Sequence, residues 1–102
     1  MRRATTPTHT FTIPEVVAVS SLEKALLTYS QNGGTVLEKT LSDLAIDNDK
    51  NSLYYELTQN ETNLFAPGKA LIQLRVKTNT GAVLESQMLC MTVKPALNSE
   101  VI

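Results

Sequence analysis

Apolar and polar residues alternate most regularly in the stretch 69–95, KALIQLRVKTNTGAVLESQMLCMTVKP. Ile72, Leu74 and Val76 alternate there with residues that are mostly polar or charged. A period of two places these two sets on opposite faces of a β-sheet. Asn79 and Gly81 favour the positive φ angles that a short hairpin loop needs. The stretch therefore predicts two long strands joined by a tight turn at 79–81.

The second strand of this hairpin, 82–93, has no single apolar face. One face carries Leu84, Met88 and Cys90, and the other carries Val83, Leu89, Met91 and Val93. Either a β-bulge changes the phase within the strand, or both of its faces are covered.

Shorter alternating stretches occur along the rest of the chain. Residues 8–13 predict a first strand that Pro14 ends. Residues 25–31 and 35–41 predict a hairpin around Asn32-Gly33, and residues 53–57 predict a further strand. Two capping boxes, Ser-x-x-Glu at 20–23 and Thr-x-x-Glu at 58–61, each predict a helical turn. Residues 43–52 are rich in Asp and Asn and predict a polar loop.

About seven strands separated by turns at roughly ten-residue intervals are typical of a β-sandwich or a small barrel. We expect an all-β fold, an immunoglobulin-like antiparallel β-sandwich with one short helical turn. Residues 8–102 would form a single domain, preceded by a flexible arm at 1–7, which carries no pattern.

Composition and charge exclude several classes of function. The 102 residues carry a formal net charge of −1 without a basic stripe, so nothing favours nucleic-acid binding. No apolar run approaches the ~20 residues of a membrane span, and no signal peptide is visible. We therefore expect no membrane partner, and a protein that is cytoplasmic before it assembles into any particle such as a virion.

Candidate chemical groups are few. Residues 47–51, Asp-Asn-Asp-Lys-Asn, resemble the start of a calcium loop, but Ser52 and Thr58 occupy the required glycine and glutamate positions. His9 has no nucleophile marked beside it, and Cys90 lies in the most apolar strand, where a buried cysteine is expected. We expect no catalysis, no metal and no cofactor.

Apolar residues on both faces of the last two strands point instead to a covered second face. We predict that another protein subunit, either a second copy or a different chain, covers it. The residues expected to make this contact are Leu71, Gln73, Leu89 and Met91. The alternative is that residues 1–7 or 43–52 fold back over this face.

A second hypothesis is a small-ligand or carbohydrate-binding sandwich. Tyr29, Tyr54 and Tyr55 would then supply the stacking surfaces. Because the chain has only five aromatic residues, and Tyr55 alternates with Leu53 and Leu57, this hypothesis ranks behind protein docking.

Several segments together resemble the β-sandwich module at the N-terminus of phage baseplate upper proteins. They are PTHTFTI at 7–13, TYSQNG at 28–33, LTQNET at 57–62 with Phe65, IQLRV at 72–76 and EVI at 100–102. The resemblance covers roughly residues 7–102 and includes no catalytic signature. It implies a structural role in a phage tail or baseplate.

Overall fold

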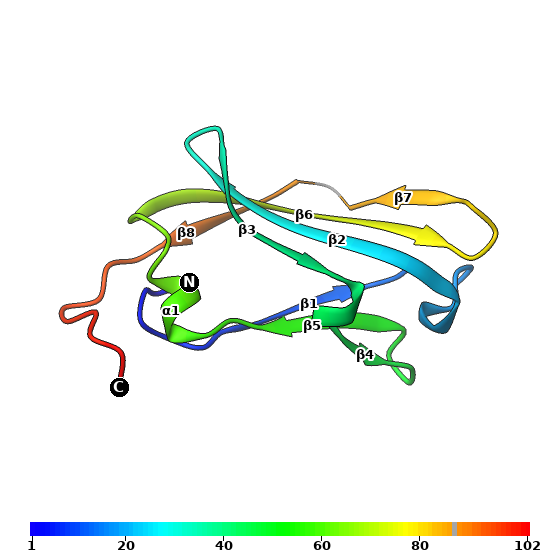
Figure 1. The fold of residues 1–102 in the computed structure, drawn as a ribbon, viewed down its shortest axis with the longest axis horizontal. Helices are drawn as coiled ribbons and strands as arrows, with labels where there is room; N and C mark the ends of the chain where they lie inside the picture. The colour runs from blue at the N-terminus through cyan, green and yellow to red at the C-terminus, as the bar shows by residue number, and fades with distance from the viewer. Residues whose placement is uncertain (87) are drawn as a thin grey trace.

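The computed structural model describes residues 1–86 and 88–102, and this part of the chain forms an antiparallel β-sandwich (Figure 1). The smaller sheet has the order β1-β5-β4. In the larger sheet the order is β3-β2-β6, and β7 and β8 follow one another along the far side of β6. The strands are β1 (Thr8–Thr12), β2 (Leu22–Gln31), β3 (Gly34–Thr40), β4 (Ala45–Asp47), β5 (Ser52–Glu56), β6 (Gly68–Thr78), β7 (Val83–Glu85) and β8 (Leu89–Val93). The predicted all-β sandwich is confirmed.

Three short helical segments complete the described fold. They are the 3₁₀ turns η1 (Val19–Ser21) and η2 (Leu41–Asp43) and the helix α1 (Gln59–Thr62). At α1 the predicted capping box is present: the Thr58 hydroxyl accepts from the Glu61 N–H at 3.1 Å, and the Glu61 carboxylate accepts from the Thr58 N–H at 2.9 Å. The other predicted capping box does not form, because Glu23 already belongs to β2 and η1 has no side-chain cap.

The β2–β3 hairpin turns where the sequence predicted it. Asn32 has a φ of 55° and Gly33 a φ of 80°, the pair of positive angles that a two-residue hairpin loop requires. On β2, the alternate residues Ala25, Leu27 and Tyr29 are buried between the sheets.

The second predicted hairpin also forms, but its return strand is divided. Lys77 pairs with Val83 and Arg75 with Glu85 along β7, whereas Ile72 pairs with Leu89 on β8. The pairing register therefore changes by one residue between Glu85 and Leu89. This shift explains the ambiguous phase of 82–93, because one extra residue exchanges the faces of a strand.

The core lies between the sheets and is closed at one end by α1 and the following turn. Its largest fully buried side chains are Tyr29, Phe65, Leu27, Leu53 and Leu57. Phe65 meets Tyr29 edge to face with ring centroids 5.8 Å apart, a favoured geometry for an aromatic pair.

Two segments differ from the sequence-based picture. The polar loop expected at 43–52 contains the short strand β4, which pairs with β5. Residues 1–7, expected as a loose arm, are hydrogen-bonded to the sandwich: the Arg3 N–H donates to the Lys94 carbonyl at 3.0 Å, and the Leu57 N–H donates to the Pro7 carbonyl at 2.9 Å.

Candidate functional site

The larger sheet has a free edge along β7 and β8. The Thr78 N–H donates to the Ala82 carbonyl and the Ser86 N–H donates to the Leu74 carbonyl. Because backbone groups alternate in direction along an antiparallel strand, those of Val83 and Glu85 face away from β6. Among the described residues, β7 pairs with no strand other than β6.

On β8 only the far end of this edge is covered. The Lys94 N–H donates to the Met1 carbonyl at 2.7 Å, so Lys94 directs its backbone groups away from β6. Cys90, four residues earlier, shares that direction. The free edge therefore comprises β7 and, on β8, Cys90.

Beyond Glu85, this free edge is apolar and lacks charge. The sequence contains no charged residue between Glu85 and Lys94. Val83, Met88 and Leu89 are each between 47% and 66% exposed. Edge strands are usually protected by charges, prolines or a covering element, and an unprotected apolar edge is a template for pairing with another strand.

The four predicted contact residues do not share one face. Leu71 and Gln73 lie on the outer face of the larger sheet, because they alternate with the buried Ile72 and Leu74. Leu89 pairs with Ile72 and Met91 pairs with Ala70, so both belong to the inner face. Met91 packs against the core, whereas Leu89 stays 47% exposed at the open edge. The register shift between β7 and β8 puts Leu89 and Met91 on the face opposite to Leu71 and Gln73, and a single sequence does not reveal this shift.

The position of Cys90 also differs from the prediction. We predicted a buried cysteine, yet Cys90 is exposed. It pairs with Leu71 on the outer face, where the described residues add no further layer. Its exposure places a compact, uncharged side chain in the free edge.

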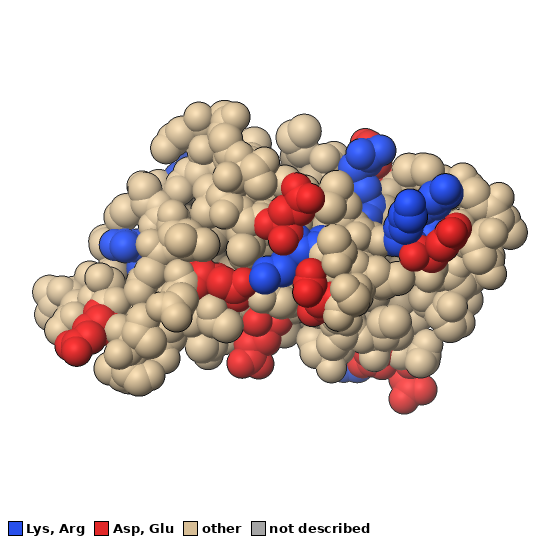
Figure 2. Space-filling view, in the orientation of Figure 1, with Lys and Arg blue, Asp and Glu red and all other residues tan. Residues whose placement is uncertain are grey.

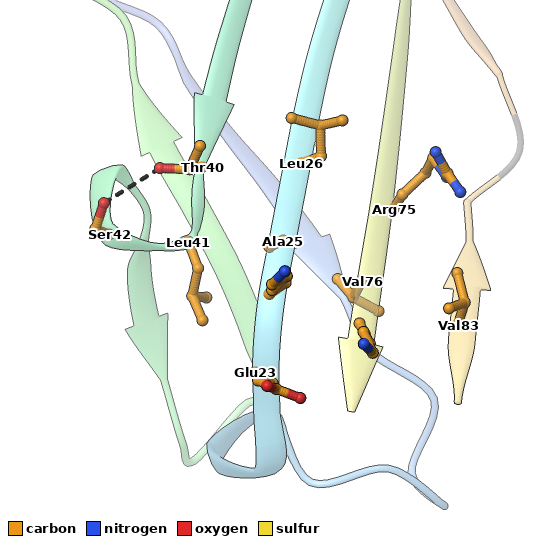
Figure 3. A pocket seen from close by; sticks show the side chains of 11 residues that line it. Glu23, Ala25, Leu26, Thr40, Leu41, Ser42, Arg75, Val76 and Val83 are labelled. Atoms are coloured by element: carbon orange, nitrogen blue, oxygen red, sulfur yellow. Dashed lines mark hydrogen bonds between the residues drawn. The ribbon is translucent and has the colours of Figure 1, made fainter. Parts of the chain in front are cut away.

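A pocket of about 580 Å³ is hollowed into the outer face beside β7 (Figure 3). Leu26 and Val83 are apolar parts of its lining, and Thr40 and Ser42 add hydroxyl groups. The cations lining it are Lys24, Arg75 and Lys77, and Glu23 also contributes to the lining. Figure 2 shows the corresponding cluster of blue side chains at the β7 end of the larger sheet, with red side chains beside it.

Two of these cations oppose each other directly. Lys24 on β2 pairs with Lys77 on β6 in the strand register, and like charges at opposite positions destabilise a sheet. The neighbouring Arg75 is compensated, because its Nε lies 2.9 Å from a carboxylate oxygen of Glu85. Among the described residues neither lysine forms an ion pair.

Replacing Lys24 by glutamate should therefore stabilise the isolated protein. The change turns a repulsive cross-strand pair into an attractive one, so the free energy of unfolding should rise by about 0.2–1 kcal/mol. Urea denaturation at low salt measures it, and about 1 M NaCl should remove most of the gain. Lys69→Glu is the control, because Lys69 pairs with Thr92 and a glutamate at this position would face no lysine. An equal gain in both variants would contradict the repulsion.

The two long sides of the sandwich differ in what lies between the sheets. At the β1 and β7 side, a groove of about 380 Å³ opens between the sheets, lined by Phe11, Ile13, Leu84 and Leu89 among others. Near β3, by contrast, a charged cluster joins the sheets: the Lys39 ammonium and the Tyr55 hydroxyl lie 2.8 Å and 2.7 Å from the Glu61 carboxylate. The side that carries the free edge is therefore grooved, and the half-exposed Leu89 is part of the groove lining.

The other candidate groups from the sequence, the Asp- and Asn-rich turn and His9, form hydrogen bonds within the fold. Asn51, at the end of the Asp- and Asn-rich turn, accepts from the Val19 N–H at 2.7 Å and donates to the Val17 carbonyl at 2.8 Å. Nδ1 of His9 lies 2.7 Å from the Tyr29 hydroxyl, and burial lowers the pKa of this histidine. Within the described residues, no three His, Cys, Asp or Glu side chains gather in a metal-binding arrangement.

The tyrosines do not form one stacking surface. Tyr29 is fully buried, and burial raises the pKa of its hydroxyl. Tyr55 bonds to Glu61 at the β3 side, whereas Tyr54 is 38% exposed and alternates with the inward Leu53 and Tyr55. The geometry therefore removes Tyr29 from the proposed carbohydrate surface and separates the other two.

Comparisons with known proteins add to the fold. The chain matches CopC from Methylosinus trichosporium OB3b with a TM-score of 0.52 and 21% identity, over 76% of this chain and 71% of that one. It also aligns with extracellular domains 3–5 of Drosophila OTK, at a TM-score of 0.32 and 11% identity over 92% of this chain and 30% of that one. At these identities the CopC likeness supports the sandwich fold alone, and the OTK alignment carries no argument.

Two further comparisons found no relative. No protein-family model matches the sequence, and no curated protein matches it. Within residues 1–86 and 88–102, none of the helical segments has the length and apolar character of a membrane span.

Proposed function

We propose that this protein is a non-enzymatic docking module that binds another protein subunit along the free edge of β7 and β8. The observation that carries the proposal is the edge itself, which has no charged residue after Glu85 and presents the half-exposed apolar side chains of Val83, Met88 and Leu89. A partner strand added there would satisfy the outward backbone groups of Val83, Glu85 and Cys90. Main-chain hydrogen bonds give such pairings affinity, and side-chain pockets give them specificity.

The groove beside the edge supports this mode of binding. Every second side chain of an added strand would face the inner side of the sheet. Those side chains would meet the groove lined by Phe11, Leu84 and Leu89, and would bury apolar surface that is now accessible. Burial of this kind contributes roughly 25 cal/mol per Å².

The proposed setting is a phage tail or baseplate. The resemblance of residues 7–102 to the module of baseplate upper proteins supports it, and such a role needs docking rather than catalysis. The partner would be a second copy of the chain or another tail protein, joined during assembly from the cytoplasm into the virion.

Substituting Cys90→Lys tests the edge. An exposed lysine places a charge where the partner strand must pair, so association should weaken at least about tenfold. The measurements are light scattering at several protein concentrations and affinity capture with mass spectrometry from cells that carry the gene. Cys90→Ser is the matched control, because it keeps the edge uncharged and should bind like the parent protein.

The result has three informative outcomes. Association that survives in Cys90→Ser and is lost in Cys90→Lys supports docking at the edge. A partner that both variants retain places docking elsewhere on the molecule. A monomer at every concentration, with no specifically captured protein, contradicts the docking function.

A further inference from the structure

We propose that the partner strand carries carboxylates on its outer face, which bind at the pocket formed by Lys24, Arg75 and Lys77. This inference rests on the docking function above and specifies the chemistry of the partner. The class of ligand is an extended segment of a protein in which acidic and apolar residues alternate.

The charges that line the pocket are unbalanced. Lys24 and Lys77 face each other across β2 and β6 and repel. The described carboxylates do not form an ion pair with either lysine, since Glu85 binds Arg75 and Glu23 makes no ion pair. Three cations and two carboxylates leave one positive charge in excess, in a chain whose net charge is −1. An arriving carboxylate would relieve this repulsion.

The pocket is continuous with the free edge. Val83 lines the pocket, and its backbone groups face the position of the added strand. Val83 pairs with Lys77, so their side chains share the outer face. An outward side chain of the partner strand would lie two strand spacings, about 10 Å, from the backbone of Lys77. A lysine and a glutamate side chain that extend toward each other can span this distance.

The two faces of the partner strand would meet different surfaces. Its inward side chains would meet the apolar groove beside Phe11 and Leu89. Its outward side chains would meet Val83 and the cations of the pocket (Figure 3), and Glu85 on the same face is already paired with Arg75. Alternating apolar and acidic residues satisfy both surfaces with the period of a β-strand. A basic outward residue opposite Val83 would approach Lys77 and be disfavoured.

Three synthetic peptides of about ten residues test this partner chemistry. Each is acetylated, amidated and fluorescein-labelled, and alternates valine with glutamate, serine or lysine. Fluorescence anisotropy at about 0.05 M NaCl should show the glutamate peptide binding about five- to tenfold more tightly than the serine peptide. The lysine peptide should bind most weakly. At about 0.5 M NaCl the preference for glutamate should largely disappear.

Variants assign the preference to the pocket. The double substitution Lys24→Gln with Lys77→Gln should remove the preference for glutamate over serine. Lys50→Gln with Lys69→Gln is the matched control, because it changes the net charge equally at two exposed lysines outside the pocket, and it should keep the preference.

Failure of the inference is distinguishable from failure of the docking function. If glutamate and serine peptides bind equally, or if the Lys24→Gln, Lys77→Gln protein keeps the preference, the acidic partner is overturned. Binding of the serine peptide that Cys90→Lys abolishes would then still support docking at the edge. If none of the three peptides binds at about 1 mM protein, both the acidic partner and the edge site are overturned.

Discussion

Replacing Phe65 by alanine should lower the free energy of unfolding by about 3–5 kcal/mol. Phe65 is 1% exposed and packs edge to face on Tyr29, at the end of the core that α1 closes. The substitution removes a buried ring and leaves a cavity between the two sheets. A domain of this size is commonly stable by only about 5–15 kcal/mol, so the loss is a large part of the total. Urea denaturation followed by circular dichroism measures it.

Leu64→Ala is the matched control for this prediction. Leu64 is the neighbouring residue and is 59% exposed, so its truncation should change the free energy of unfolding by less than about 0.5 kcal/mol. Similar losses in the two variants would mean that Phe65 does not close the core.

Local patterns were sufficient to predict most strands. The alternation of Ile72, Leu74 and Val76 and the turn at Asn32-Gly33 depend on neighbouring residues only, and both are confirmed. The failed capping box at 20–23 shows the limit of such patterns. Its four residues fit a helix N-terminus, but the pairing of Leu22 with Thr78 draws the second half of the segment into β2, and the first half ends the 3₁₀ turn η1. Tertiary pairing therefore overrides a local preference.

The candidate site depends on register, which local patterns do not determine. Lys24 and Lys77 lie 53 positions apart in the sequence, and they become opposite only through the β2–β6 pairing. The one-residue shift between β7 and β8 likewise decides that Cys90 points outward and Met91 inward. The sequence did indicate this region, because apolar residues on both faces of 82–93 are unusual for a strand with one solvated face.

Removing the carboxylate of Glu61 should give the second large effect. Glu61 accepts hydrogen bonds from the Tyr55 hydroxyl, the Lys39 ammonium and the Thr58 N–H, so it joins α1 to both sheets. Glu61→Ala leaves these donors without their shared acceptor at a partly buried position. We expect the free energy of unfolding at neutral pH to fall by about 1–3 kcal/mol. Urea denaturation of the two proteins measures the difference.

The effect of Glu61 should depend on pH in a defined direction. Burial alone would raise the pKa of this carboxyl, but the hydrogen bonds from Lys39, Thr58 and Tyr55 outweigh burial and hold the pKa below its ordinary value of 4.5. A group whose pKa is lower in the folded state stabilises the fold above its unfolded pKa, and this contribution is lost as the pH falls through the folded pKa. The stability difference between the parent protein and Glu61→Ala should therefore be constant near neutrality and narrow below pH 4.5.

Glu56→Ala separates this network from the general effect of losing a negative charge. Glu56 is exposed on β5 opposite Thr8, and its removal should cost less than about 0.5 kcal/mol at any of these pH values. If the two variants lose similar stability, or if the difference for Glu61→Ala widens in acid, the carboxylate does not join the sheets. The expected result would show that the Glu61 network holds the two sheets together on the β3 side of the sandwich.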